Sequence, residues 1–123
     1  MPRILVVDDD ASIRRLLETA LDDLAEVVEV ESGEDALAST ATDVPDLAIV
    51  DVAMPGIDGL ELVRRWRADE ATAGLEIVLL SGLTEGADEQ RGYHAGADAY
   101  VTKPVEIDVL YALVAAMLAA QQA

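Results

Sequence analysis

The chain has 123 residues, of which 52% are hydrophobic, so it is long enough to bury one core and form one domain. It carries 25 acidic residues against eight lysines and arginines, and this net charge of −17 argues against direct binding to nucleic acid or to an anionic membrane. The lack of cysteine excludes disulfides and thiolate metal sites, and no apolar run is long enough for a membrane span or a signal peptide, so we expect a cytoplasmic protein.

The N-terminal quarter alternates between apolar runs and amphipathic stretches. Ile4–Val7 predicts a buried parallel strand that runs into the three aspartates of Asp8–Asp10. Apolar residues at intervals of three and four predict a helix from about Ser12 to Leu24. Residues 27–30 predict a second strand, and Ser32 has the features of a helix N-cap.

The rest of the chain repeats this alternation three times. Apolar strands are predicted to end in polar residues: 47–50 at Asp51, 77–80 at Ser81 and 99–102 at Lys103. Helices are predicted from Asp58 through Trp66, over Glu85–His94, and from Ile107 to Ala120. Five strand–helix pairs at this spacing predict right-handed crossovers and an α/β fold, a parallel sheet with helices on both faces.

Polar residues follow four of the five predicted strands, where an open doubly wound sheet binds its ligands. They are Asp8 and Asp9, Asp51, Ser81, and Thr102 with Lys103. Three carboxylates in one pocket repel one another, so either their pKa values rise or a cation lies among them, and oxygen ligands with room for water favour Mg²⁺. A nucleophilic carboxylate beside a metal, a hydroxyl and an ammonium group is an arrangement for phosphoryl transfer.

Several of these strings resemble the signature of one family. Ile4–Asp9, the string DVAMPGIDG that begins at Asp51, Ser81, and Lys103-Pro104 are similar to bacterial response-regulator (CheY-like) receiver domains, and the resemblance covers essentially the whole chain. It implies a (βα)5 doubly wound, flavodoxin-like three-layer sandwich with strand order 2-1-3-4-5. It also implies a single receiver domain over residues 1–123 that acts as a switch and not as an enzyme.

The resemblance implies a phosphoacceptor with a metal beside it. Asp51 would accept the phosphoryl group, and Mg²⁺ would be bound by Asp9, Asp51 and the Ala53 carbonyl, with Asp8 acting through metal-bound water. In the family, the residues two after the phosphoacceptor and two after the Ser or Thr control access of the hydrolytic water. Here these are Ala53 and Leu83, which cannot position water, so we predict slow loss of the phosphoryl group.

The resemblance also implies a set of residues that sense the phosphoryl group. Ser81 would bind it and reorient, Lys103 would contact a phosphoryl oxygen, and Tyr100 would be an aromatic switch. The Lys103-Pro104 peptide bond would be cis. Glycines within and beside the predicted fourth helix make it a weak helix, and we expect it to repack when Asp51 is phosphorylated.

The expected partners are proteins. The resemblance implies a histidine kinase or phosphotransfer protein as phosphodonor, and a downstream effector or output domain that contacts the surface of the fourth helix, fifth strand and fifth helix. The last helix has a second apolar stripe that includes Val109 and Leu113 and no basic residue, which suggests a homodimer or another hydrophobic contact. An alanine-rich helix that has no partner explains the same apolar stripe equally well.

Two other functions remain open at this point. The string from Asp8 to Ser12 faintly matches the D-x-D-x-T motif of haloacid-dehalogenase-like phosphatases, in which Asp8 would be phosphorylated, but this leaves Asp51 and Lys103 unexplained. The other alternative is a receiver-like binding module that is never phosphorylated.

Some polar and aromatic residues have simpler explanations. Asp10 and Asp58 fit helix caps better than catalytic groups. His94 has no second histidine or cysteine with which to share a metal, so a surface or packing role is expected, and Trp66 is expected in the core.

Overall fold

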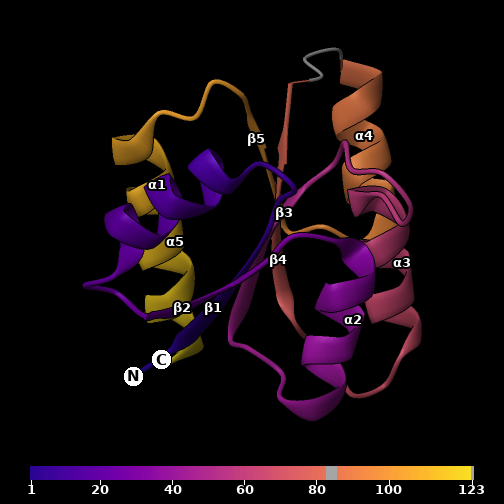
Figure 1. The fold of residues 1–123 in the computed structure, drawn as a ribbon, viewed down its shortest axis with the longest axis horizontal. Coiled ribbons are helices and arrows are strands. Elements are labelled where there is room, and N and C mark those ends of the chain that lie inside the picture. Colours follow the sequence, from indigo (N-terminus) through magenta and orange to yellow (C-terminus); the bar gives the residue numbers. More distant parts are fainter. Residues whose placement is uncertain (83–85, 123) are drawn as a thin grey trace.

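The computed structural model describes residues 1–82 and 86–122, and its centre is a five-stranded parallel sheet (Figure 1). The strands are β1 (Arg3–Val7), β2 (Glu26–Val30), β3 (Leu47–Asp51), β4 (Glu76–Ser81) and β5 (Ala99–Thr102). The helices are α1 (Ala11–Leu21), α2 (Gly33–Thr42), α3 (Gly59–Ala68), α4 (Gly86–Ala95) and α5 (Ile107–Gln121). The strand order is β2-β1-β3-β4-β5 and every pair is parallel, which confirms the predicted doubly wound fold.

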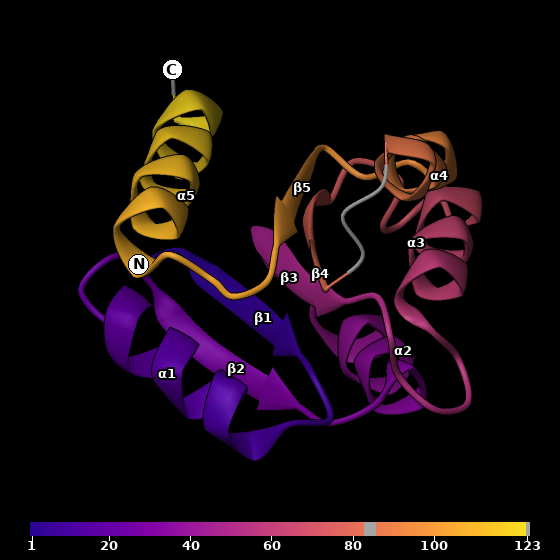
Figure 2. The ribbon, with the colours of Figure 1, turned by 90° about the horizontal axis from the view of Figure 1, so that it is seen from above.

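Helices cover both faces of the sheet, as Figure 2 shows from above. One face packs against α1 and α5 through a core that includes Leu17, Leu21, Leu110 and Val114. The other face packs against α2, α3 and α4, where Trp66 is 1% exposed and its indole lies in the core as predicted. The middle strands β1, β3 and β4 are nearly continuous apolar runs because both of their faces are covered.

Side-chain caps fix where three helices begin. The carboxylate of Asp10 accepts a hydrogen bond from Ser12 N, and that of Asp58 accepts one from Glu61 N, which confirms both residues as caps. Ser32 caps α2 in the same way, also as predicted. The predicted end of α1 at Leu24 was wrong, because Leu24 N donates to Leu21 O in a tighter turn that ends the helix.

Two further observations concern the helices. The predicted start of the fourth helix at Glu85 lies outside the described residues, and α4 is described from Gly86. Among the residues that the structure describes, no helix combines the length and apolar character that a membrane crossing needs.

Candidate functional site

The register of the sheet brings the predicted polar residues to one edge. Val7 lies opposite Val50 in the β1–β3 pair, so the following residues, Asp8 and Asp51, emerge side by side. Ser81 ends β4, and Lys103 follows β5 and donates its backbone N–H to Ser81 O at 2.7 Å. Asp8 and Ser81 are each 1% exposed and Asp51 is 5% exposed, so these polar groups are buried rather than part of the solvated surface.

Three of the carboxylates lie close enough to share a cation. One oxygen each from Asp8, Asp9 and Asp51 lies within 4.8 Å of the others, and Asp9 is exposed while the other two are buried. Oxygen donors with one side open to solvent suit Mg²⁺, which keeps several of its waters. Ala53 is exposed on the loop that follows Asp51. The donor set therefore fits a divalent cation of this class.

Lys103 is the cation that the chain itself supplies. Its Nζ lies 3.1 Å from Asp51 Oδ1 and 3.4 Å from Asp8 Oδ2. Burial on its own lowers the pKa of Lys103, but the hydrogen bond and charge of Asp51, followed by those of Asp8, outweigh burial and raise this pKa. The ammonium group is therefore fully charged. The Lys103-Pro104 peptide bond is cis, the isomer that the resemblance implies.

One positive charge does not balance the three carboxylates. Burial raises the pKa of Asp8, and the neighbouring Asp51 carboxylate raises it further. The Asp10 N–H, which donates to Asp8 Oδ1 at 2.9 Å, and Lys103 offset only part of this rise. The ionised site is therefore electrostatically unfavourable until another cation enters it.

The residues assigned to the switch occupy the strands beside the acids. Ser81 is buried at the end of β4, next to β3, which carries Asp51. Tyr100 on β5 is half-buried and packs into the core between the sheet and the helices α2, α3 and α4. His94 is exposed on α4, as expected for a surface residue. Leu83, on which part of the prediction of slow phosphoryl loss rests, lies outside the described residues.

The loop that carries Ala53 is closed and held in place by residues that the sequence analysis did not identify. Gly59 N donates to Val52 O at 2.9 Å, and a Cβ at Gly59 would lie 2.5 Å from Asp51 O, so only glycine fits there. Glu34 of α2 accepts a hydrogen bond from Ile57 N at 3.2 Å. This contact joins residues 23 positions apart, and no local sequence pattern marks it.

Arg14 also contributes without having been predicted. Its guanidinium donates to Asp8 O at 2.7 Å, and its side chain is only 16% exposed. The bond fixes the backbone at the end of β1 from the first turn of α1. Helical periodicity marks Arg14 as polar surface and gives no signal for this contact.

Two residues of the second apolar stripe of α5 differ in exposure. Val109 is 55% exposed, but Leu113 is half-buried and packs into the core shared by α1 and α5. Leu113 reaches that core because the apolar face of α5 is broad. Val109 remains exposed.

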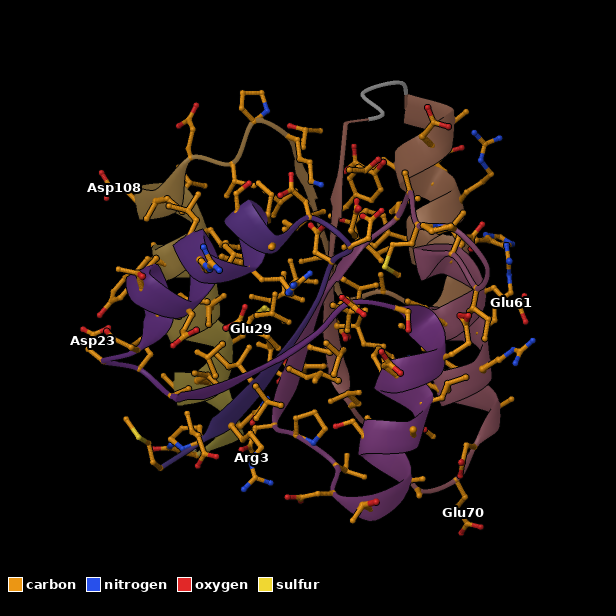
Figure 3. The ribbon with its side chains drawn as sticks, in the orientation of Figure 1. Arg3, Asp23, Glu29, Glu61, Glu70 and Asp108 are labelled. Carbon is orange, nitrogen blue, oxygen red and sulfur yellow. The ribbon has the colours of Figure 1, made fainter. Side chains whose placement is uncertain are left out.

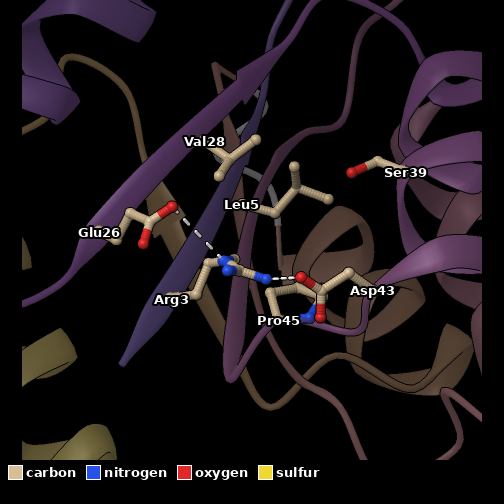
Figure 4. A pocket seen from close by; sticks show the side chains of 7 residues that line it. All are labelled: Arg3, Leu5, Glu26, Val28, Ser39, Asp43 and Pro45. Atoms are coloured by element: carbon tan, nitrogen blue, oxygen red, sulfur yellow. Dashed lines mark ion pairs between the residues drawn. The ribbon is translucent and has the colours of Figure 1, made fainter. Parts of the chain in front are cut away.

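A separate hollow lies at the opposite edge of the sheet, where β1 and β2 begin. Figure 4 shows Arg3 at its centre, paired with Glu26 at 3.7 Å and with Asp43. The two acids neutralise the guanidinium, and the hollow lacks the cluster of carboxylates and ammonium found around Asp51. The Asp51 edge is therefore the stronger candidate site.

Comparison with known proteins agrees with this geometry. The family model described as "Response regulator receiver domain" matches residues 4–115. The chain belongs to the response regulator receiver family. As a receiver, it is 38% identical over 122 residues to the DNA-binding dual master transcriptional regulator RpaA of Synechocystis, covering 96% of this chain and 49% of that protein. It is 41% identical to the response regulator PleD of Caulobacter vibrioides, covering 91% of this chain and 25% of PleD.

Solved receiver structures are also similar. The BeF3-activated receiver domain of DrrB, a Thermotoga maritima protein, aligns with a TM-score of 0.88 and 33% identity, covering 96% of this chain and 97% of that chain. The chemotaxis protein CheY4 of Vibrio cholerae aligns with a TM-score of 0.89 and 30% identity, covering 95% and 98% of the two chains. The CheY-like topology of this receiver is thus found in known members of the family.

Family membership changes two of the sequence-based interpretations. It argues against the dehalogenase-like phosphatase, which belongs to a different family and would use Asp8 as nucleophile.

The receiver spans about half or less of the curated relatives it matches, and RpaA is named as DNA-binding. The expectation of no nucleic acid therefore rests on the charge of this chain and does not extend to a longer protein of this kind.

Proposed function

We propose that this receiver is a phosphorylatable domain of a two-component phosphorelay, spanning residues 1–123, in which Asp51 accepts the phosphoryl group. The observation that carries the proposal is the contact of 3.1 Å between Lys103 Nζ and Asp51 Oδ1 within the cluster of three carboxylates. A buried carboxylate beside a cation and a candidate metal site is poised for attack on phosphorus and not only for a structural ion pair.

Asp9, Asp51 and the Ala53 carbonyl would hold Mg²⁺, with Asp8 contributing through metal-bound water. When bound, Mg²⁺ would neutralise negative charge on the transferring phosphoryl group. An Asp51 carboxylate oxygen forms the new bond to phosphorus, and the bond from phosphorus to the donor's oxygen or nitrogen breaks as the donor leaves. Lys103, fully charged between Asp8 and Asp51, would then contact a phosphoryl oxygen.

The readout would pass through Ser81, Tyr100 and α4. In this proposal, the phosphoryl group draws the Ser81 hydroxyl toward Asp51, the Tyr100 ring turns inward, and α4 repacks in a shift of a pre-existing equilibrium. The packing of Tyr100 against Gly92 of α4 supports a coupling between the two, because a movement of the ring removes a direct contact with the helix. Amide hydrogen exchange across α4 with and without a phosphoryl analogue tests the coupling.

The proposed partners follow from the same function. A histidine kinase or phosphotransfer protein would donate the phosphoryl group, and an effector or output domain would contact the surface of α4, β5 and α5, with no enzymatic activity of the receiver itself and a cytoplasmic location. A homodimer through α5 would bury Val109, which is 55% exposed. Val109→Glu is the appropriate test, since Leu113 also supports the core.

The decisive experiment is phosphorylation by a small donor. The protein is incubated with Mg²⁺ and acetyl phosphate, and the adduct is located by mass spectrometry in the wild type and in Asp51→Asn. A Mg²⁺-dependent adduct on Asp51 that the variant lacks supports the proposal. An adduct on Asp8 would restore the phosphatase alternative, and no adduct with acetyl phosphate or phosphoramidate would favour a receiver-like binding module that is not phosphorylated.

A further inference from the structure

The helices α3 and α4 are less acidic than the chain as a whole. The helix α3 contains three arginines and one acid, Glu61. The helix α4 contains one arginine, Arg91, and two acids, Asp88 and Glu89. These two helices together therefore carry a formal charge of +1, whereas the whole chain carries −17. Glu61 lies on the outer side of α3 (Figure 3). Two of these arginines, Arg64 and Arg91, are exposed, whereas Arg67 donates to Gly96 O and Asp98 and is only 21% exposed.

A hollow of about 410 Å³ lies between α3 and α4. Its lining consists of Arg64, Ala87, Gln90, Arg91, His94 and Ala95. The hollow exists because the two alanines leave room between longer polar side chains. Each of the four polar side chains can donate a hydrogen bond, and none is a carboxylate. Its volume falls in the range of small-molecule sites, roughly 300–1,000 Å³.

The absence of carboxylates from this lining distinguishes it from the other hollows described. The hollow around Arg3 includes Glu26 and Asp43, and the one beside Pro104 includes Glu106. The hollow between the starts of β3 and β4 includes two acids as well. In a chain with 25 acids, a lining of donors alone favours an anionic ligand.

The two arginines are available for a ligand. Glu61 Oε2 lies 3.1 Å from Arg65 Nε, whereas its other oxygen lies 3.7 Å from Arg64 NH1, so Arg64 is the more loosely held of the two. The side chains of Arg64 and Arg91 are 54% and 60% exposed. Arg91 pairs with Asp88 of the same helix, and the Asp88 side chain is 12% exposed while that of Arg91 keeps an open side. A ligand anion can therefore reach the open side of both guanidinium groups and add to the contacts they already make.

We propose that this hollow binds a small phosphorylated molecule. Guanidinium groups from two helices, an amide and an imidazole offer more donors than one carboxylate accepts, and a phosphate monoester presents three strong acceptor oxygens. Ala87 and Ala95 provide apolar surface for the carbon atoms of the ligand. The acidic remainder of the chain repels nucleic acids and acidic proteins but affects a small anion much less. The hollow shares no residue with the Asp51 site, so this inference does not depend on the proposed function.

Phenyl phosphate is a suitable probe, because it joins a phosphate monoester to an apolar ring. In a titration of the whole chain followed by amide NMR without divalent metal, we expect saturable shifts on α3 and α4 with a dissociation constant of about 1 mM or tighter. Inorganic phosphate should bind more weakly because it lacks the ring, and benzoate should bind more weakly because it presents fewer acceptor oxygens. Shifts confined to the surroundings of Lys103, or no shifts up to about 10 mM, would overturn the proposal.

Variants separate this site from general charge attraction. Arg64→Gln and Arg91→Gln should each weaken phenyl phosphate binding at least about tenfold. Arg65→Gln is the matched control, because Arg65 lies on the same helix and pairs with the same Glu61 but does not line the hollow. Its affinity, and that of Asp51→Asn, should stay at the wild-type value. An equal loss of affinity in Arg65→Gln would mean that the effect comes from net charge alone. Unchanged binding in Arg64→Gln and Arg91→Gln would refute the site.

Discussion

A Cβ at Gly92 would lie 2.8 Å from Cδ2 of Tyr100, so the Tyr100 ring packs directly on the backbone of α4. Leu79 Cδ1 would lie 3.1 Å from the same Cβ, on the other side of the contact. Gly92 is buried, whereas most of α4 is exposed. The contact between α4 and Tyr100, the aromatic residue of the proposed switch, therefore depends on the absence of a side chain at Gly92.

Gly92→Ala should destabilise the protein by about 1–3 kcal/mol, because the added methyl group overpacks the contact with Tyr100. This expected change in stability is opposite in sign to the usual effect of Gly→Ala inside a helix, which stabilises a protein by up to about 1 kcal/mol. Gly86→Ala is the control, since among the described residues nothing outside its own helix backbone and chain neighbours lies within 4 Å of its Cβ position. Urea unfolding measures both variants, and equal stabilisation by both would contradict the tight contact.

Asp8→Asn should raise the free energy of unfolding at neutral pH when divalent metal is removed. Burial raises the pKa of Asp8 above 3.8, so its ionised form opposes folding, and asparagine removes that charge while keeping an acceptor for Asp10 N. Because the folded pKa is the higher one, the gain is complete above it and vanishes as the pH falls below 3.8.

The same variant should respond less than the wild type to Mg²⁺, measured as the rise in Tm on addition of the metal. Asp10→Asn is the control: Asp10 is an exposed N-cap, asparagine caps equally well, and its stability should stay nearly constant. If Asp8→Asn proves less stable than the wild type in metal-free buffer, the carboxylate cluster is not a source of repulsion.

Arg67→Lys should cost about 2–3 kcal/mol, because lysine cannot reproduce a planar group with several donors. The Arg67 guanidinium donates to Gly96 O at 2.9 Å, to Ala73 O at 3.0 Å and to Asp98 Oδ2 at 3.0 Å. Arg65→Lys changes an exposed residue of the same helix and should cost less than about 1 kcal/mol. Thermal and urea unfolding compare the two, and similar losses would show that the contacts of Arg67 add little.

The phenol of Tyr111 should titrate above 10.0. Its hydroxyl donates to Asp23 Oδ2 at 2.7 Å, and this hydrogen bond is the main reason that its pKa is raised. Asp23, which follows α1, lies on the outer side of the molecule (Figure 3). Because the folded pKa is above the unfolded one, the stabilisation is complete below pH 10.0 and is lost as the pH rises through the folded pKa. NMR titration of the Tyr111 ring should show a lower pKa in Asp23→Asn, and an unchanged pKa would mean that the bond does not persist in solution.

The sequence predicted which residues gather at the carboxyl ends of the strands better than it predicted the contacts that hold this region in place. Apolar runs that end in Asp8, Asp51 and Ser81 define parallel strands, and parallel strands bring their carboxyl ends together, so the convergence of these residues followed from local patterns. The bonds of Arg67 and the bond from Glu34 to Ile57 join segments far apart in the chain, and hydrophobic periodicity contains no information about them.

Helix faces were predicted less well than strand ends for a related reason. The broad apolar surface of α5 does not define one buried stripe, so the sequence could not show that Leu113 reaches the core while Val109 stays exposed. The hollow between α3 and α4 was not predicted either, because it depends on how the two helices pack and on the small size of two alanines.

The bond from Gly59 N to Val52 O holds the two ends of the loop between β3 and α3 together. Its two ends already touch, and the entropic cost of closing a longer loop rises only by about 0.6 kcal/mol for each doubling of its length. Ala53 and Pro55, which are exposed, can therefore be replaced while Asp51 and α3 keep their positions, whereas Met54 is buried in the core. These exposed positions are the ones at which the proposed metal affinity and phosphoryl lifetime can be varied without rebuilding the sheet.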